Sequence, residues 1–238
     1  MELSRVRRSR EAAGSSYDRI SRIYDFLSYR SEWRHAEQGL QLLNAQNGEK
    51  VLEIGFGTGR ALVALARAVG SSGRVFGIDL SAGMCRIAGS RLEKAGLEGR
   101  AELMTGDAIQ LSFDNNVFDA VFTSFTLELF DTPEIPIVLH ECRRVLKTGG
   151  RICVVSLSRT GNPSLMLRLY EWSHRAFPGL IDCRPIFVRT AIEEAGLRVL
   201  DFIRKMMWGL PIEIVMAEKP EARLVEPSVP FGQTRTET

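Results

Sequence analysis

The sequence predicts an α/β fold that is doubly wound around a mostly parallel sheet. Three observations indicate it: apolar runs alternate with segments of helical period, a glycine-rich turn joins the first apolar run to a helix, and two strand-like runs on a short link close the pattern. Such alternation places helices on both faces of a parallel sheet. At 238 residues, with 45% hydrophobic and 25% charged residues, the chain has the size of one such domain with short additions.

The N-terminal region is expected to contain an arm followed by a helix. Residues 1–14 are basic and lack periodicity, which predicts a flexible arm. Residues 15–44 have a helical pattern, because Trp33, Ala36, Leu40 and Leu43 recur at three-to-four spacing.

The remaining elements follow in order. Strands are expected at about 50–54, 74–78, 101–105, 118–124 and 151–157, and helices at 60–69, 82–95, around 135–146 and 188–195. Glycines should end the last two helices, with Thr148-Gly149-Gly150 closing the first of them. The runs 198–207 and 212–218 are too close in sequence for a crossover, so they should pair antiparallel. The tail 219–238 is proline-rich and polar, which predicts disorder.

The run from Val51 to Arg60 indicates a ligand site. An apolar strand ends in a turn that contains Gly55, Gly57 and Gly59, and a helix follows. Glycine lets the backbone come close to a ligand, and the start of a helix offers unpaired N–H groups to an anion. Asp79 ends the next strand, twenty residues after Gly59, which is the offset expected of a carboxylate that binds ribose hydroxyls. A dinucleotide turn would have glycine where Arg60 stands, so a nicotinamide enzyme is only an alternative.

Further residues are candidates for binding an adenosine-containing cofactor. Ligands of open parallel sheets bind at the carboxyl ends of the strands, near the point where strand order reverses. Ser124, Phe125 and Thr126 should line the reaction site there, whereas Asp119, at the start of the same strand, should be structural. The other candidates follow the second and third strands: Leu80, Met84, Gly106, Asp107 and Ala108. Ordinary alternatives are helix packing for Met84 and a turn or cap role for Asp107.

These features together resemble the class I S-adenosylmethionine (SAM)-dependent methyltransferases over about residues 47–157. The resemblance rests on Glu53 with the three turn glycines, on Asp79 with Met84, on Gly106-Asp107, on Phe118-Asp119-Ala120-Val121 and on Leu146-Lys147-Thr148-Gly149-Gly150. It implies SAM as the cofactor, with Glu53 and Tyr24 added to the binding residues. It also implies a Rossmann-like, seven-stranded sheet with one antiparallel strand, within a domain spanning residues 47–218.

A second resemblance concerns the N-terminal segment. Tyr17-Asp18, Ser21 and Tyr24-Asp25, with Trp33 following, are similar to the start of methyltransferases of ubiquinone and menaquinone biosynthesis, and small phospholipid N-methyltransferases share a related segment. The resemblance implies that residues 15–46 form a lid over the cofactor, with tyrosines facing the site.

The acceptor is expected to be a small or lipid-like molecule, methylated by in-line displacement. A phenol or an activated carbon must lose a proton, which needs a general base. Candidates are Tyr17, Tyr24, Glu128 and His174, each of which also has an ordinary packing or surface interpretation. Segment 158–187 should shape the acceptor pocket, and its aromatic residues, together with Trp208, would line that pocket or simply cover the sheet.

Composition argues against several other functions. The net charge of +2 offers no general basis for binding nucleic acid. A methyltransferase acting on protein or RNA is therefore only the alternative function, and a SAM-binding protein without enzymatic activity is a remote alternative. The scattered cysteines and histidines predict no metal site and reduced thiols, and Cys183 is the cysteine most favoured to lie near substrate. With neither a signal peptide nor a membrane-spanning run apparent, a cytoplasmic protein is expected. Its basic arm would make weak peripheral contact with the inner membrane face.

Overall fold

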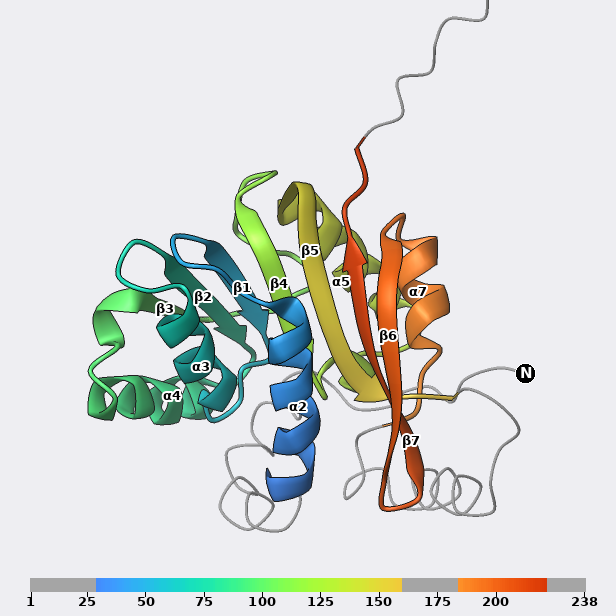
Figure 1. The fold of residues 1–238 in the computed structure, drawn as a ribbon, viewed down its shortest axis with the longest axis horizontal. Helices are drawn as coiled ribbons and strands as arrows, with labels where there is room; N and C mark the ends of the chain where they lie inside the picture. Colours follow the sequence, from blue (N-terminus) through green and yellow to red (C-terminus); the bar gives the residue numbers. More distant parts are fainter. Residues whose placement is uncertain (1–28, 160–183, 222–238) are drawn as a thin grey trace, which may run out of the picture.

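The computed structural model describes residues 29–159 and 184–221, in which seven strands form one twisted sheet (Figure 1). The strand order is β3-β2-β1-β4-β5-β7-β6. The strands are β1 (Lys50–Ile54), β2 (Arg74–Asp79), β3 (Ala101–Thr105), β4 (Phe118–Ser124), β5 (Leu146–Leu157), β6 (Arg198–Met207) and β7 (Leu210–Glu218). The first five pair in parallel, and β7 is antiparallel to both β5 and β6. The predicted fold class and the closing antiparallel pair are confirmed.

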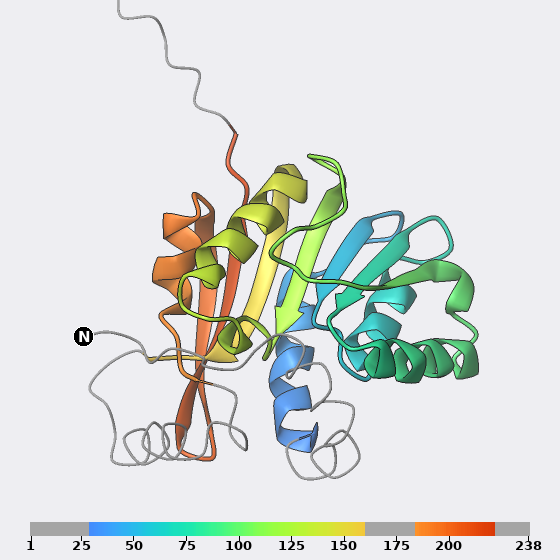
Figure 2. The same ribbon diagram turned by 180° about the vertical axis from the view of Figure 1, so that it is seen from behind.

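Helices cover both faces of the sheet and create two apolar cores, as the two opposite views show (Figures 1 and 2). One core contains residues of α2 (Tyr29–Leu43), α3 (Arg60–Ala68) and α4 (Ala82–Lys94). The other contains residues of α5 (Glu134–Val145) and α7 (Val188–Glu194). Two short 3₁₀ helices, η1 (Glu98–Arg100) and η2 (Leu127–Leu129), complete the described elements. The central strands are buried on both sides, as expected of a parallel sheet.

The apolar stripe of α2 packs on the sheet as its spacing predicts. Ala36 and Leu43 are buried, and Trp33 and Leu40 pack against the same core. The guanidinium carbon of Arg60, at the start of α3, lies 4.0 Å from the centroid of the Trp33 ring. This cation–π contact joins α2 to the helix that follows the glycine turn.

Two boundaries differ from the sequence prediction. Helix α5 ends at Val145, and the glycines expected to cap it lie within β5 instead. There the Gly149 N–H donates to the Lys219 carbonyl, and the Lys219 N–H donates to the Gly150 carbonyl. The glycines therefore shape a strand pairing rather than a helix end. Lys219 also donates through Nζ to the carbonyl of Leu146, so the predicted disordered tail starts too early at 219.

Two expected segments lie largely outside the described residues. The described chain begins at Tyr29, within the helix expected over 15–44, so the arm and the first half of the expected lid lie outside those residues. Most of the expected acceptor segment 158–187 lies outside them as well. Within the described ranges, no helix has both the length and the apolar character required to cross a bilayer.

Candidate functional site

The glycine turn lies where the strand order reverses. Strand β1 pairs with β2 on one side and with β4 on the other, so the segments that follow β1 and β4 emerge together at the carboxyl edge of the sheet. The turn carries Gly55, Gly57 and Gly59, and the β4 exit carries Ser124 to Thr126. These two predicted groups are brought together, because Thr126 contacts the turn directly: its Oγ1 donates to the Gly55 carbonyl at 3.3 Å.

The three glycines are required for different physical reasons, although all have positive φ. A Cβ on Gly55 would lie 2.2 Å from Thr126 Cγ2, and one on Gly59 would lie 2.6 Å from the Cβ of Ala88 in α4. These two glycines allow close packing within the protein. A Cβ on Gly57 would meet nothing within 4 Å. Gly57 therefore presents open backbone, as a turn that receives a ligand must.

Asp79 connects the turn to α4. Its Oδ2 accepts a hydrogen bond from the Gly57 N–H and its Oδ1 accepts one from the Ser81 N–H, both at 2.9 Å. Ser81 in turn caps α4 by accepting from the Met84 N–H. Burial raises the pKa of the Asp79 carboxyl, and these backbone hydrogen bonds oppose part of that rise. Asp79 thus ties the glycine turn after β1 to the start of α4.

Glu53 is a buried acid in the strand that leads to the turn. Glu53 is 3% exposed, and its Oε2 has no hydrogen-bond partner among the described residues. Burial, and secondarily the nearby charge of Asp79, raises the pKa of this carboxyl well above its usual range. Buried polar atoms are rarely left unsatisfied. Among the described residues nothing satisfies this oxygen, so it is open to a polar group from outside them.

The loop after β3 closes the same edge. The Gly106 N–H donates to the Asp79 carbonyl at 2.9 Å, which brings this loop beside Asp79. Asp107 accepts from the Ile109 N–H at 3.1 Å, so it also has the turn role that the sequence allowed. Ala108 is buried, whereas Leu80 is 41% exposed beside Asp79. Met84 is partly buried against the α3–α4 core.

Phe125 is backbone-strained at the end of β4. It has a φ of +51°, an unusual value for a bulky side chain, and its N–H donates to the Val155 carbonyl at 2.8 Å. Strained residues held by their surroundings concentrate at functional sites. The strained backbone of Phe125 lies between Ser124 and Thr126, and no sequence pattern predicts this conformation.

Glu128 lies beyond this reversal, on η2, and is fully buried. Its Oε2 accepts from the Ser156 hydroxyl at 2.8 Å, and its Oε1 accepts from the Leu157 N–H at 3.2 Å. Burial raises the pKa of Glu128 to about 7, against hydrogen bonds that lower it, and the charge of Glu32 adds to the rise. Sequence reasoning missed Ser156, although a serine within the apolar run at the end of β5 is a recognisable signal.

The remaining candidates are placed differently. Tyr17, Tyr24, His174 and Cys183 lie outside the described residues. Asp119 lies at the far end of β4, where it accepts from the Lys50 N–H and pairs with Lys147 at 2.5 Å, so its structural role is confirmed. Three cysteines, Cys85, Cys142 and Cys153, are free thiols. Trp208 is 57% exposed at the β6–β7 turn rather than buried in a pocket.

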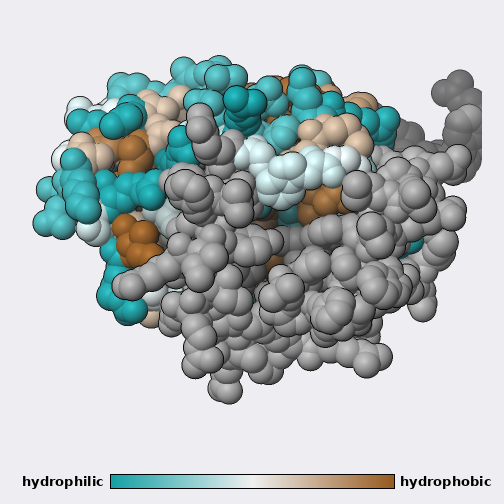
Figure 3. Space-filling view, turned by 90° about the horizontal axis from the view of Figure 1, so that it is seen from below, coloured by the Kyte–Doolittle hydropathy of each residue, from teal (hydrophilic) through white to brown (hydrophobic). Residues whose placement is uncertain are grey.

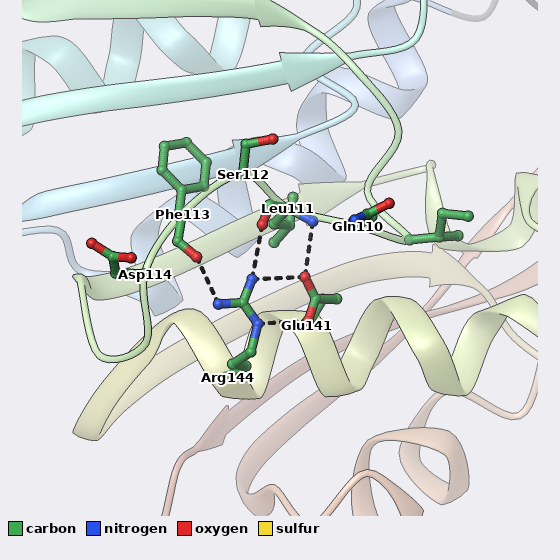
Figure 4. Close-up of a pocket in the computed structure, with 8 residues that line it drawn as sticks. Gln110, Leu111, Ser112, Phe113, Asp114, Glu141 and Arg144 are labelled. Atoms are coloured by element: carbon green, nitrogen blue, oxygen red, sulfur yellow. Dashed lines mark hydrogen bonds and ion pairs between the residues drawn. The ribbon is translucent and has the colours of Figure 1, made fainter.

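A cavity of about 430 Å³ lies elsewhere, between the segment 109–114 and α5 (Figure 4). Its centre is the guanidinium of Arg144, which donates to the carbonyls of Leu111 and Phe113 and pairs with Glu141. Glu141 also accepts from the Leu111 N–H at 2.8 Å. These polar groups satisfy one another, so the cluster fastens the loop to α5 and is not the candidate site.

Comparisons with known proteins agree with this geometry. A family described as a methyltransferase domain matches residues 51–150. The demethylmenaquinone methyltransferase of Geobacillus kaustophilus is 35% identical over 162 residues, which cover 68% of this chain and 65% of that protein. The enzyme of the same name from Bacillus pumilus is 30% identical over 209 residues, which cover 76% of this chain and 83% of that protein.

Solved structures share the fold at lower identity. The [4+2]-cyclase SpnF superimposes with a TM-score of 0.73 at 18% identity, covering 90% of this chain and 97% of that one. The geranyl diphosphate C-methyltransferase of Streptomyces coelicolor gives a TM-score of 0.63 at 17% identity, with 80% of each chain covered. Identities this low support the fold and no particular chemistry.

Proposed function

The chain belongs to the class I SAM-dependent methyltransferases, near the demethylmenaquinone methyltransferases, and on this premise we propose that its acceptor is a demethylmenaquinone-like quinone precursor. The observation that carries the proposal is the extent of the match. The similarity to the Bacillus pumilus enzyme covers 76% of this chain, well beyond the methyltransferase domain at 51–150. It therefore includes sequence outside the cofactor module, where acceptor pockets are built.

The described residues fit SAM. Open backbone at Gly57 suits the close approach of the cofactor, Asp79 suits the ribose hydroxyls, and the unsatisfied Glu53 Oε2 suits a donor group. SAM supplies an electrophilic methyl group on a sulfonium whose charge is lost on transfer. A dry site favours such a loss of charge. We assign the remaining predicted contacts to Leu80, Met84, Gly106, Asp107, Ala108, Ser124 and Phe125, and the lid contact to Tyr24.

Proton removal from the acceptor is assigned to Glu128 among the described residues. A quinol ring becomes a better nucleophile when a hydroxyl proton is removed, so the site needs a base with a pKa near the working pH. Glu128 meets this requirement, because burial raises its pKa to about 7. It also lies near the carboxyl ends of β4 and β5, one turn beyond the strained Phe125. Tyr17, Tyr24 and His174 remain candidates for the same role.

The test is methyl transfer from methyl-labelled SAM to defined acceptors by the full chain. A chemically reduced short-chain demethylmenaquinone should become labelled in the organic phase, and an Asp79→Ala variant should transfer much less label at a limiting SAM concentration. Phosphatidylethanolamine vesicles, total RNA and a protein extract serve as competing acceptors. Transfer to any of these without transfer to the quinol would contradict the proposal and favour the phospholipid or macromolecular alternative.

Localisation forms a separate part of the proposal. A lipid-like acceptor would be reached at the inner face of a membrane, and the basic arm of residues 1–14 would make weak contact with anionic lipid there. Removing the arm should lower binding to anionic vesicles at low salt. Unchanged binding would remove the arm from this role.

A further inference from the structure

The turn between β6 and β7 has a tryptophan where a smaller residue is favoured. Met207 pairs with Leu210, which leaves a two-residue turn of Trp208 and Gly209. Both turn residues have positive φ, 51° and 79°. That combination marks the type I′ hairpin, for which Asn-Gly is the preferred sequence and a bulky side chain is strained. The chain therefore holds an indole at the tip against a backbone preference.

The hairpin tip lies at the carboxyl edge of the sheet. Strand β6 runs in the same direction as β1 to β5, since β7 is antiparallel to both β5 and β6, so the end of β6 is on the same side as the glycine turn. The last residue of β5, Leu157, pairs with Ile212, while the β6–β7 ladder continues beyond it to the turn. Figure 1 shows the hairpin reaching past the end of β5.

The tip combines apolar and cationic side chains in water. Trp208 is 57% exposed and Met206 is 61% exposed. Lys205 is exposed and forms no ion pair with a described residue. Burial lowers the pKa of His35 in α2, and the charges of Lys205 and the exposed Arg34 lower it further, so both cations lie within electrostatic range of that ring. Where described residues are visible in the view from below, hydrophilic and apolar areas alternate (Figure 3).

We propose that the hairpin tip, comprising Lys205, Met206 and Trp208, contacts the surface of an anionic lipid bilayer and turns the carboxyl edge of the sheet toward the membrane. An indole with one apolar body and one N–H suits the boundary between headgroups and acyl chains. Lys205 and Arg34 supply the charge complementarity to anionic headgroups. The contact with the membrane does not depend on which acceptor is methylated. Its role in substrate entry rests on the proposed function, since a lipid-borne quinone would enter at this edge.

The same surface is poorly suited to pairing with a second copy of the chain. Strand β6 is the edge of the sheet, but a bulge interrupts its ladder between Val199 and Asp201. Charged side chains at Arg198, Asp201, Arg204 and Lys205 line the strand. Bulges and charges are the devices by which edge strands avoid addition of another strand. The tip also lies at a turn rather than along the pairing edge.

The experiment measures co-sedimentation of the full chain with vesicles of phosphatidylglycerol and phosphatidylcholine. Trp208→Asn is the main variant, because it creates the preferred Asn-Gly turn and should keep or raise the melting temperature. We expect about tenfold weaker vesicle binding. Leu200→Asn is the matched control: Leu200 is 50% exposed but lies toward the other end of β6, so vesicle binding should be unchanged.

Three results would overturn the inference. The first is that the wild-type chain does not bind anionic vesicles. The second is that Trp208→Asn binds them as well as the wild type does. The third is that light scattering shows a wild-type dimer, which the Trp208→Asn substitution dissociates, while neither protein binds vesicles. Methyl transfer to a detergent-dispersed short-chain quinol separates this inference from the proposed function. Vesicle binding without any quinol methylation would reject the acceptor and leave the membrane contact standing.

Discussion

Asp79 and Gly57 are joined by a hydrogen bond of 2.9 Å from the glycine N–H to the carboxylate. The acid that ends β2 therefore fixes the backbone of the turn that follows β1. Its second oxygen holds the Ser81 N–H at the start of α4. One carboxylate thus shapes the turn and, in the proposed binding mode, also accepts from the cofactor, so these two effects should be lost together.

Asp79→Ala should weaken SAM binding by more than about tenfold. Each charge-assisted hydrogen bond to a ribose hydroxyl contributes about 1.5–3 kcal/mol, and the turn also loses its tether. Isothermal titration calorimetry measures the effect. Asp119→Ala is the matched control, because Asp119 is an acid at the far end of β4. Wild-type affinity in Asp79→Ala would refute the ribose role.

The two turn glycines Gly55 and Gly57 should respond differently to alanine. Gly57→Ala should fold with a modest loss of about 1–2 kcal/mol from its positive φ, and it should lose SAM affinity because the new Cβ points into open space. Gly55→Ala should lose much more stability, since its Cβ would overlap Thr126. Thermal melts and SAM titrations separate the two effects. Equal destabilisation of both variants would contradict this division.

Glu128 should make stability depend on pH. Burial raises its pKa to about 7 from a usual 4.5, so the native state keeps a proton that the unfolded chain has lost. Its contribution to stability is therefore present below about pH 4.5 and falls by about 3 kcal/mol as pH rises to about 7. Glu128→Gln should remove this fall, which melts at pH 5 and pH 8 will show. An identical pH response in both proteins would count against the raised pKa.

The same residue should shape the pH profile of turnover. If Glu128 is the base, kcat rises through a pKa near 7 in the wild-type enzyme, and Glu128→Gln loses about 100-fold or more in kcat. Ser156→Ala removes a hydrogen bond that lowers the pKa of Glu128, so the rise in kcat should move to higher pH while activity is retained. An unshifted profile in Ser156→Ala would make Glu128 only a structural tie between η2 and β5.

Deleting residues 1–28 should spare the fold and damage turnover. Helix α2 keeps its packing through Trp33, Ala36, Leu40 and Leu43, and the contact between Trp33 and Arg60 is intact. The predicted lid tyrosines, Tyr17 and Tyr24, are removed. Circular dichroism, SAM affinity and kcat should be compared with Tyr17→Phe and Tyr24→Phe in the full chain. Full turnover by the truncated chain would end the lid hypothesis.

Local sequence signals predicted that the glycine turn and Asp79 come together, because each is continuous with its strand. The glycine turn and Asp79 each follow a strand directly, and parallel pairing of β1 with β2 brings them together without any long-range information. The same reasoning misassigned Thr148-Gly149-Gly150. A glycine pair at the end of a helix and a glycine pair in a bulged strand have the same local sequence. Only the hydrogen bonds of Gly149 and Gly150 with Lys219 distinguish the two cases here.

The sequence by itself determined the fold class and which strands flank the glycine turn, because periodicity, turn chemistry and fixed spacing are local properties. Its motifs also carried the family resemblance that implied the cofactor. Only the tertiary structure decided which turn glycine faces open space and which faces a neighbour, that Glu128 is buried against Ser156, and that Trp208 is exposed at the carboxyl edge of the sheet. These depend on which surfaces residues far apart in the chain bury against each other, and packing of that kind leaves no periodic trace in the sequence.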